Sequence, residues 1–123
     1  MLKNILIVGF GSFVGGIARY LTYLLIDKRL GGSLPINTFI VNIIGSLILG
    51  VLAGLLIKNQ INDSTRLALA VGFCGSYTTF STFALDNMQL LNQKPTTAFI
   101  YIIASVVIGI AAVFMGFYMG KSL

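Results

Sequence analysis

The residues of this sequence that are most able to do chemistry lie together in the stretch GFCGSYTTFSTF, at positions 72–83. Glycine disfavours a continuous helix, and so do side chains whose hydroxyls compete for backbone hydrogen bonds. The stretch therefore predicts one of two structures: a kink in which hydroxyls bond back to the helix, or a true break. A break inside a membrane is tolerated where it is buried in protein or lines a cavity, and the carbonyls that it frees suit a bare cation.

Two phenylalanines stand in the second half of the same stretch. Phe80 and Phe83 are three residues apart, which places them on one face of a helix. Aromatic rings most often fill a core, but their edges carry partial positive charge. The pair is therefore compatible with simple packing and also with contact to an anion.

Polar residues recur at every fourth position in two other apolar segments. They are Thr38, Asn42 and Ser46 in one segment, and Thr97, Tyr101, Ser105 and Gly109 in the other. An amide in hydrocarbon must form hydrogen bonds, so Asn42 either joins two helices or lines a pore as a donor. The second series is either an interfacial tyrosine with a packing groove or a row of hydroxyl donors.

Arg19 lies inside an otherwise apolar segment, some four residues or about 6 Å past its middle. A charge at such a depth costs about 2.5 kcal/mol or more unless it reaches the interface or water. Two interpretations stay open. Arg19 either extends towards Asp27 and the interface, or provides positive charge in a water-filled vestibule that attracts anions.

Several classes of chemistry are excluded by the residues that the chain lacks. It has no histidine and one cysteine, Cys74, so catalytic triads, histidine metal sites and disulfides are not expected, and the chain is not expected to be an enzyme. No carboxylate lies near the centre of an apolar segment, as a proton-coupled antiporter or an acidic cation path would need. The remaining deep groups all offer positive poles, which favours a pathway for a small anion.

These residues must be positioned by helices in a membrane. Of 123 residues, 57% are hydrophobic and only 9% are charged, whereas a soluble domain carries about a quarter charged residues. A helix needs roughly 20 residues to cross a hydrocarbon core. We therefore expect an all-α membrane protein with four transmembrane helices, the third kinked or broken at residues 72–83. It would form a single domain over residues 1–123, with spans at about 4–26, 36–57, 66–91 and 96–119.

Small residues at four-residue spacing predict where these helices approach one another closely. The first span carries Gly11 with Gly15 and Ser12 with Gly16, and the fourth carries Ala112, Gly116 and Gly120. The glycines of the first span do not form a nucleotide-binding loop, because that motif needs a preceding strand. Both sets are expected to be helix-packing faces.

Basic residues are shared almost evenly between the two sides of the membrane. With four spans, one side holds Lys3, Lys58, Arg66 and Lys121, and the other holds Lys28, Arg29 and Lys94. Because an excess of basic residues on one side sets the orientation of a membrane protein, this chain is expected to insert both ways. Two oppositely oriented copies would then form an antiparallel pair, comparable to inverted repeats.

Three motifs of the sequence resemble the small bacterial fluoride channels of the Fluc family, and the resemblance extends over essentially the full length. They are GFGSFVGGIARY at 9–20, NTFIVNIIGS at 37–46 and, the most specific, GFCGSYTTFSTF at 72–83. The resemblance implies a dual-topology antiparallel homodimer in the bacterial cell (inner or plasma) membrane. It also implies passive, fluoride-selective conduction that exports F− through two pores per dimer and prevents fluoride toxicity.

The same resemblance implies the residues of two sites. The third helix would be broken mid-membrane, and backbone carbonyls of Gly75 and Thr78 from both subunits would hold a structural Na+ at the centre of the dimer interface. The fluoride pathway would involve Arg19, Asn42, Phe80, Ser81, Thr82, Phe83, Tyr101 and Ser105. The chain departs from the family's pattern one turn beyond Ser105, where relatives often carry a hydroxyl and this chain has Gly109. Asp86 stands where many relatives have Glu, and no role is assigned to it.

Two rival functions remain beside a channel. A small dual-topology drug or cation antiporter also has four short spans, but it should carry a Glu in the first span, and this chain contains no Glu. A membrane scaffold that transports nothing would use the polar series only as contacts between helices. Measurement of ion flux separates the scaffold from the channel.

Overall fold

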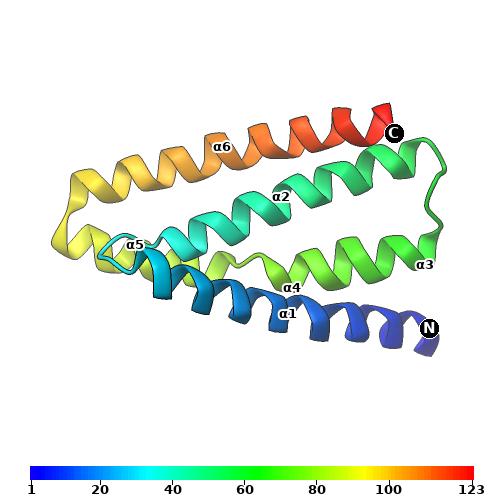
Figure 1. Ribbon diagram of the computed structural model, residues 1–123, viewed down its shortest axis with the longest axis horizontal. Coiled ribbons are helices and arrows are strands. Elements are labelled where there is room, and N and C mark those ends of the chain that lie inside the picture. Colours follow the sequence, from blue (N-terminus) through cyan, green and yellow to red (C-terminus); the bar gives the residue numbers. More distant parts are fainter.

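The computed structural model describes residues 1–123, and nearly all of them are helical (Figure 1). The elements are α1 (Leu2–Leu30), α2 (Ile36–Ile57), α3 (Asp63–Arg66), the π-helix η1 (Leu67–Cys74), α4 (Gly75–Tyr77), α5 (Phe80–Gln93) and α6 (Pro95–Ser122). Four helical segments are long and apolar enough to span a membrane, the third running from Asp63 to Gln93. The prediction of an all-helical protein with four membrane-spanning helices is confirmed, and both termini lie at one end of the molecule (Figure 1).

The helices extend beyond three of the four predicted spans. The first, for example, continues to Leu30 and so includes Lys28 and Arg29 in its last turn. The expected spans end where charged residues begin, because only apolar residues are stable in hydrocarbon. A helix can continue through the headgroup region, where basic side chains near its C-terminus also interact favourably with the helix dipole.

Small-residue faces predicted in the first and fourth spans pack closely on neighbouring helices, but on different partners. A Cβ added at Gly116 or Gly120 would collide with the backbone of α2, at Leu47 and Val51 respectively. Glycines Gly50 and Gly54 of α2 are equally close to the backbone of α6. Helices α2 and α6 therefore lie side by side along most of their length (Figure 1).

In α1, the face that packs closely is the one formed by Gly11 and Gly15. A Cβ at either position would collide with a carbonyl of η1, Ala68 or Phe73. No neighbouring atom lies within 4 Å of a Cβ placed at Gly16, so the pairing of Ser12 with Gly16 is not a packing face within the chain. The reason is geometric: Gly16 follows Gly15 by about 100° around the helix and so turns away from η1.

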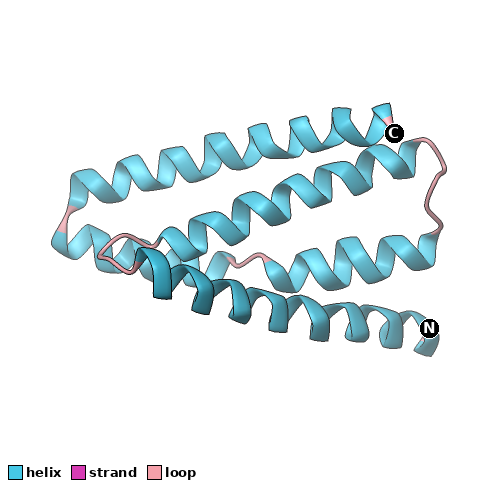
Figure 2. Ribbon diagram, viewed as in Figure 1, coloured by secondary structure: helices cyan, strands magenta, loops and turns pink.

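The third span is interrupted at Thr78 and Thr79, which is the second of the two structures that the stretch 72–83 allowed. Thr78 has φ −80° and ψ 159°, and Thr79 has φ −147° and ψ 119°, so both are extended. Figure 2 shows this segment as a loop between two helices. Back-bonding is present too, since the Thr78 hydroxyl donates to the Cys74 carbonyl at 2.9 Å. The π-helix η1 that precedes the break was not predicted; such wide turns often occur near functional sites.

Candidate functional site

Asn42 of α2 holds the backbone of the break from both sides. Its Nδ2 donates to the carbonyl of Thr79 at 3.1 Å, and its Oδ1 accepts the Thr79 N–H at 2.8 Å. Thr79 is only 6% exposed, so water does not replace these bonds. The contacts are those of an amide that joins two helices. One N–H of the Asn42 amide takes no part in them and can still donate to a bound group.

The break leaves several carbonyls, including those of Gly75 and Thr78, without the donors that a continuous helix would provide. The carbonyl of Gly75 would accept from the N–H of Thr79, but that N–H bonds to Asn42. The carbonyl of Thr78 would accept from the N–H of Thr82, but that N–H bonds to the Thr79 hydroxyl at 3.2 Å. Both carbonyls therefore remain able to bind a ligand.

Thr79 also caps the helix that begins after the break. Its Oγ1 accepts the N–H of Thr82 and donates to the Thr82 hydroxyl at 3.1 Å, and the Ser81 hydroxyl lies 3.5 Å away. Such a cap satisfies a free N–H of the first turn. The positive end of the α5 dipole consequently faces the break. A threonine directly before a helix signals such a cap, but this signal was not used in the prediction.

A cavity of about 300 Å³ opens between α2 and the two halves of the third span. Four of the predicted site residues line it together, alongside Ser46, Cys74 and Thr79: they are Asn42, Gly75, Thr78 and Phe80. No atom lies within 4 Å of a Cβ placed at Gly75. The ring of Phe80 is 79% exposed. Within a single chain this cavity is therefore open on one side.

A row of rings continues from this cavity towards α6. The centroid of the Phe83 ring lies 5.9 Å from that of Phe80 and 5.7 Å from that of Tyr101. The Tyr101 hydroxyl donates to the carbonyl of Pro35 at 3.2 Å. One turn further along α6, the hydroxyl of Ser105 is buried and has no hydrogen-bond partner. The structure therefore brings these four predicted residues into one continuous row.

Arg19 reaches the break and does not pair with Asp27. Its Nη1 donates to the carbonyl of Thr78 at 3.4 Å, while Asp27 accepts a hydrogen bond from Asn37 at 3.0 Å. The single ion pair of the chain joins Arg66 to Asp63. The contacts do not support the interpretation that Arg19 extends towards Asp27; the other, positive charge in a water-filled vestibule, stays a prediction.

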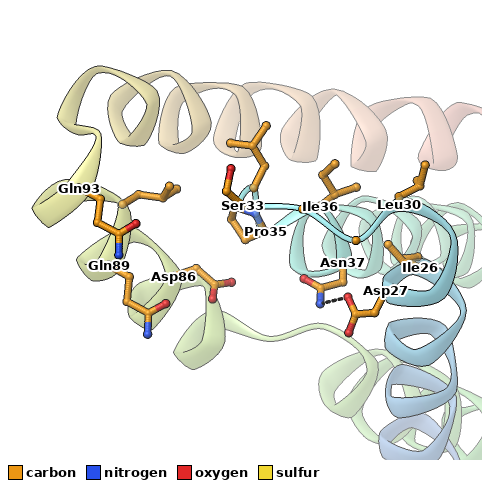
Figure 3. Close-up of a pocket in the computed structure, with 14 residues that line it drawn as sticks. Ile26, Asp27, Leu30, Ser33, Pro35, Ile36, Asn37, Asp86, Gln89 and Gln93 are labelled. Carbon is orange, nitrogen blue, oxygen red and sulfur yellow. Dashed lines mark hydrogen bonds between the residues drawn. The ribbon is translucent and has the colours of Figure 1, made fainter.

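Thr38 and Asp86 form a polar connection that was not predicted. The fully buried Thr38 donates to the Asp86 carboxylate at 2.7 Å and accepts from the Tyr23 hydroxyl at 2.9 Å. Asp86 also lines a polar cavity of about 240 Å³ at the end of the molecule, together with Asp27 and Asn37 (Figure 3). The four-residue spacing of Thr38 and Asn42 indicated that both lie on one face of α2. It could not identify the partner of Thr38, because Asp86 lies 48 residues away in the sequence.

Comparison with known proteins identifies the family. Residues 6–117 match the model of the CrcB-like protein family, described as Camphor Resistance (CrcB). The chain is 45% identical over 121 residues to the fluoride-specific ion channel FluC of Gloeothece citriformis, covering 98% of each. It is 38% identical over 119 residues to that of Azobacteroides pseudotrichonymphae, covering 95% of each. The fluoride-specific ion channel FluC 1 of Nitrobacter hamburgensis is 42% identical over 114 residues, which is 91% of this chain and 90% of that protein.

These matches agree with the resemblance carried by the three sequence motifs, and they extend over both halves of the broken third span. The chain belongs to the CrcB-like family, the family of the fluoride-specific ion channel FluC proteins.

Proposed function

We propose that this protein is a passive, fluoride-selective channel of the bacterial cell membrane, which exports F− and so protects the cell from fluoride toxicity. Relatives that match nearly the whole chain are named as fluoride-specific ion channels, and not as enzymes. The working unit is proposed to be an antiparallel homodimer with two pores and a central structural Na+.

The observation that carries this proposal is the gathering of positive poles around the break. The N-terminus of α5 begins directly after Thr79, and the Arg19 guanidinium touches Thr78. Arg19 has no carboxylate partner that would neutralise it. Half-helix N-termini attract anionic groups in membrane transporters for the same electrostatic reason. An anion is therefore the ion that the N-terminal end of α5 accommodates best.

The row of rings and hydroxyls supports a path for a small anion. Fluoride is strongly hydrated, so a pore must replace its water with donors of its own. The edges of Phe80 and Phe83 offer partial positive charge. The unpartnered hydroxyl of Ser105 offers a hydrogen bond that no protein group accepts. The Tyr101 hydroxyl is bonded to Pro35, but its ring lies beside Phe83, one helical turn before Ser105. Ring edges and the Ser105 hydroxyl therefore follow one another along α5 and α6.

A sodium ion fits the break because the donor set is made of backbone oxygens. No group of three acidic, cysteine or histidine side chains exists that could hold a metal. The carbonyls of Gly75 and Thr78 lack helical donors, and space is open at Gly75. Two carbonyls are too few for a bare cation, but a second chain related by a two-fold axis would supply two more. When bound, the ion would be coordinated by carbonyls of both breaks and would hold the two chains together.

The open side of the cavity supports a dimer. Phe80 projects from the surface with 79% of its area exposed, and it borders the cavity that contains Gly75 and Thr78. A second copy placed on this side would cover the ring and complete the ion site. In an antiparallel pair each α5 faces the opposite direction, so one sequence would produce two equivalent pathways.

Fluoride efflux from liposomes tests the proposal. Purified protein in liposomes loaded with potassium fluoride should release F− only after a potassium ionophore is added, because passive conduction is electrogenic. Liposomes loaded with potassium chloride should retain Cl− under the same conditions. Equal release of both ions would contradict selectivity, and release of neither would favour a scaffold without transport.

A further inference from the structure

Arg19 is the basic residue that lies deepest within the apolar segments. The other basic residues stand in loops or within about one turn of the end of a spanning segment; they are Lys3, Lys28, Arg29, Lys58, Arg66, Lys94 and Lys121. The Arg19 side chain is half-buried, which makes a charge without a counter-ion costly. Attraction of anions at the surface does not explain how this half-buried charge is stabilised, so Arg19 must have a partner within the protein.

The contact partner of Arg19 is one of the carbonyls freed at the break, that of Thr78. Nη1 of Arg19 lies 3.4 Å from the carbonyl oxygen of Thr78, across 59 residues of sequence. This bond joins α1 to the residue at which the third span loses its helical hydrogen bonds. In a single chain, the guanidinium thus stabilises a carbonyl that would otherwise be unpaired at mid-membrane. An unpaired backbone group in the hydrocarbon core costs on the order of several kcal/mol.

The same oxygen is a proposed ligand of the sodium ion. A carbonyl oxygen has two lone pairs, so it can contact a guanidinium and a metal ion together. Two positive charges on one oxygen repel each other, and the repulsion is strong where water is scarce. The guanidinium must therefore weaken the binding of Na+ to Thr78, even though it holds the carbonyl in place.

We propose that Arg19 sets the affinity of the dimer for sodium by sharing the Thr78 carbonyl with it. The guanidinium holds the break in the chain before assembly, and it limits how tightly the ion binds once two breaks meet. Arg19 is in this respect a positioning residue of the ion site. The inference rests on the proposed sodium-containing dimer and adds to it a residue that ligates no metal.

The dependence of stability on sodium tests this inference without any measurement of transport. The melting midpoint of the purified protein in detergent is followed as Na+ replaces N-methylglucamine at constant ionic strength. Arg19→Gln keeps a donor but removes the charge, and it should lower the half-saturating Na+ concentration by about tenfold or more. Arg19→Lys keeps the charge and should change that concentration by less than about threefold. The control Lys28→Gln, at an exposed position of α1, should leave it unchanged.

The outcomes separate this inference from the function on which it rests. An Arg19→Gln variant with the half-saturating Na+ of the wild type, or a higher one, overturns the inference while fluoride efflux by the wild type still supports the channel. A wild-type melting midpoint that does not respond to Na+ overturns both the sodium site and the role of Arg19. Arg19→Met, which keeps the apolar part of the side chain, replaces Arg19→Gln if the latter does not fold.

Discussion

At the scale of single residues, the site depends on how Asn42 binds the break. The amide replaces two backbone hydrogen bonds that the extended conformation of Thr79 forfeits. An unpaired buried backbone group costs about 1–3 kcal/mol. The Asn42 side chain removes this cost for both the N–H and the carbonyl of Thr79, and so stabilises the interruption in the membrane. The polar residues around the break therefore have two functions: some stabilise the unusual backbone, and others remain free to contact an ion.

Substitution of the ring pair tests which side chains contact the ion. Phe80→Ile or Phe83→Ile removes the polarised ring edge but retains an apolar side chain. We expect fluoride efflux to fall by about tenfold, the effect of a barrier higher by about 1.4 kcal/mol. The dimer should stay folded, because isoleucine retains an apolar side chain at both positions and Phe83 is only half-buried within the chain.

Phe13→Ile provides the matched control for the rings. Phe13 is 66% exposed on α1, and it turns away from the face of Gly11 that contacts η1. Its substitution should leave efflux unchanged. If both ring variants conduct as fast as this control, the rings do not lie on the path.

At the scale of the elements, the broken third span presents two ends of opposite polarity at one place. The first half ends in the freed carbonyls of Gly75 and Thr78, and the second half begins with the capped N-terminus of α5. A cation is favoured at the former and an anion at the latter. One interruption thus produces a site for each kind of ion, and α1 and α2 stabilise it through Arg19 and Asn42.

The close approach of α2 and α6 is tested by two glycines of α6. Gly116→Ala would place a methyl group against the carbonyl of Leu47, and overpacking of this kind costs about 1–3 kcal/mol. A Cβ at Gly109 would lie 3.9 Å from Ile43 Cδ1, an ordinary contact. Gly109→Ala should therefore be neutral or stabilising by up to about 1 kcal/mol, because alanine favours a helix.

Thermal unfolding followed by the helical circular dichroism signal measures this difference. The melting midpoint of Gly116→Ala should fall below that of the wild type, and that of Gly109→Ala should not. A Gly116→Ala variant as stable as Gly109→Ala would show that the two helices have room to move apart.

At the scale of the whole molecule, the chain leaves most of its apolar surface uncovered. Only 18 of its 123 residues are buried, as expected for a protein whose outer surface contacts lipid or a second copy. The two close helix pairs, α2 with α6 and α1 with η1, make few contacts with each other. The cavity at the break lies between α2 and the third span, where a partner chain could fill the space.

Orientation in the membrane is tested by labelling of single cysteines. In a Cys74→Ser background, Ser122→Cys places an exposed thiol at the C-terminal end. An impermeant maleimide should label about half of the chains from outside intact cells and the rest after permeabilisation, since basic residues are balanced four against three. Labelling from one side only would contradict an antiparallel dimer.

A charge variant provides the control for this measurement. Gln60→Lys combined with Lys94→Gln changes the balance from four against three to five against two, by addition of one basic residue to the first side and removal of one from the second. Labelling should then shift towards a single side. Dimer formation and fluoride efflux should fall together, because antiparallel pairs need both orientations.

The composition of the chain and the order of neighbouring residues were sufficient to predict the membrane class and the four spans. They limited the third span to a kink or a break, and the resemblance favoured the break. Apolar length, glycine spacing and the competition of hydroxyls for backbone bonds are properties of neighbouring residues, so they can be read without a structure. The motifs were also sufficient to indicate the family. The extent of the helices was less predictable, because a helix continues past the hydrocarbon into regions that tolerate charge.

The contacts of the site were decided only by the tertiary structure. Asn42 meets Thr79 across 37 residues and Arg19 meets Thr78 across 59, and spacing along the chain contains no information about such partners. Whether an amide joins helices or faces a pore, and whether an arginine reaches the interface or the break, depends on which segments lie opposite. That choice is made by the packing of glycine faces between helices, since close approach of the backbones brings the polar side chains within hydrogen-bonding distance.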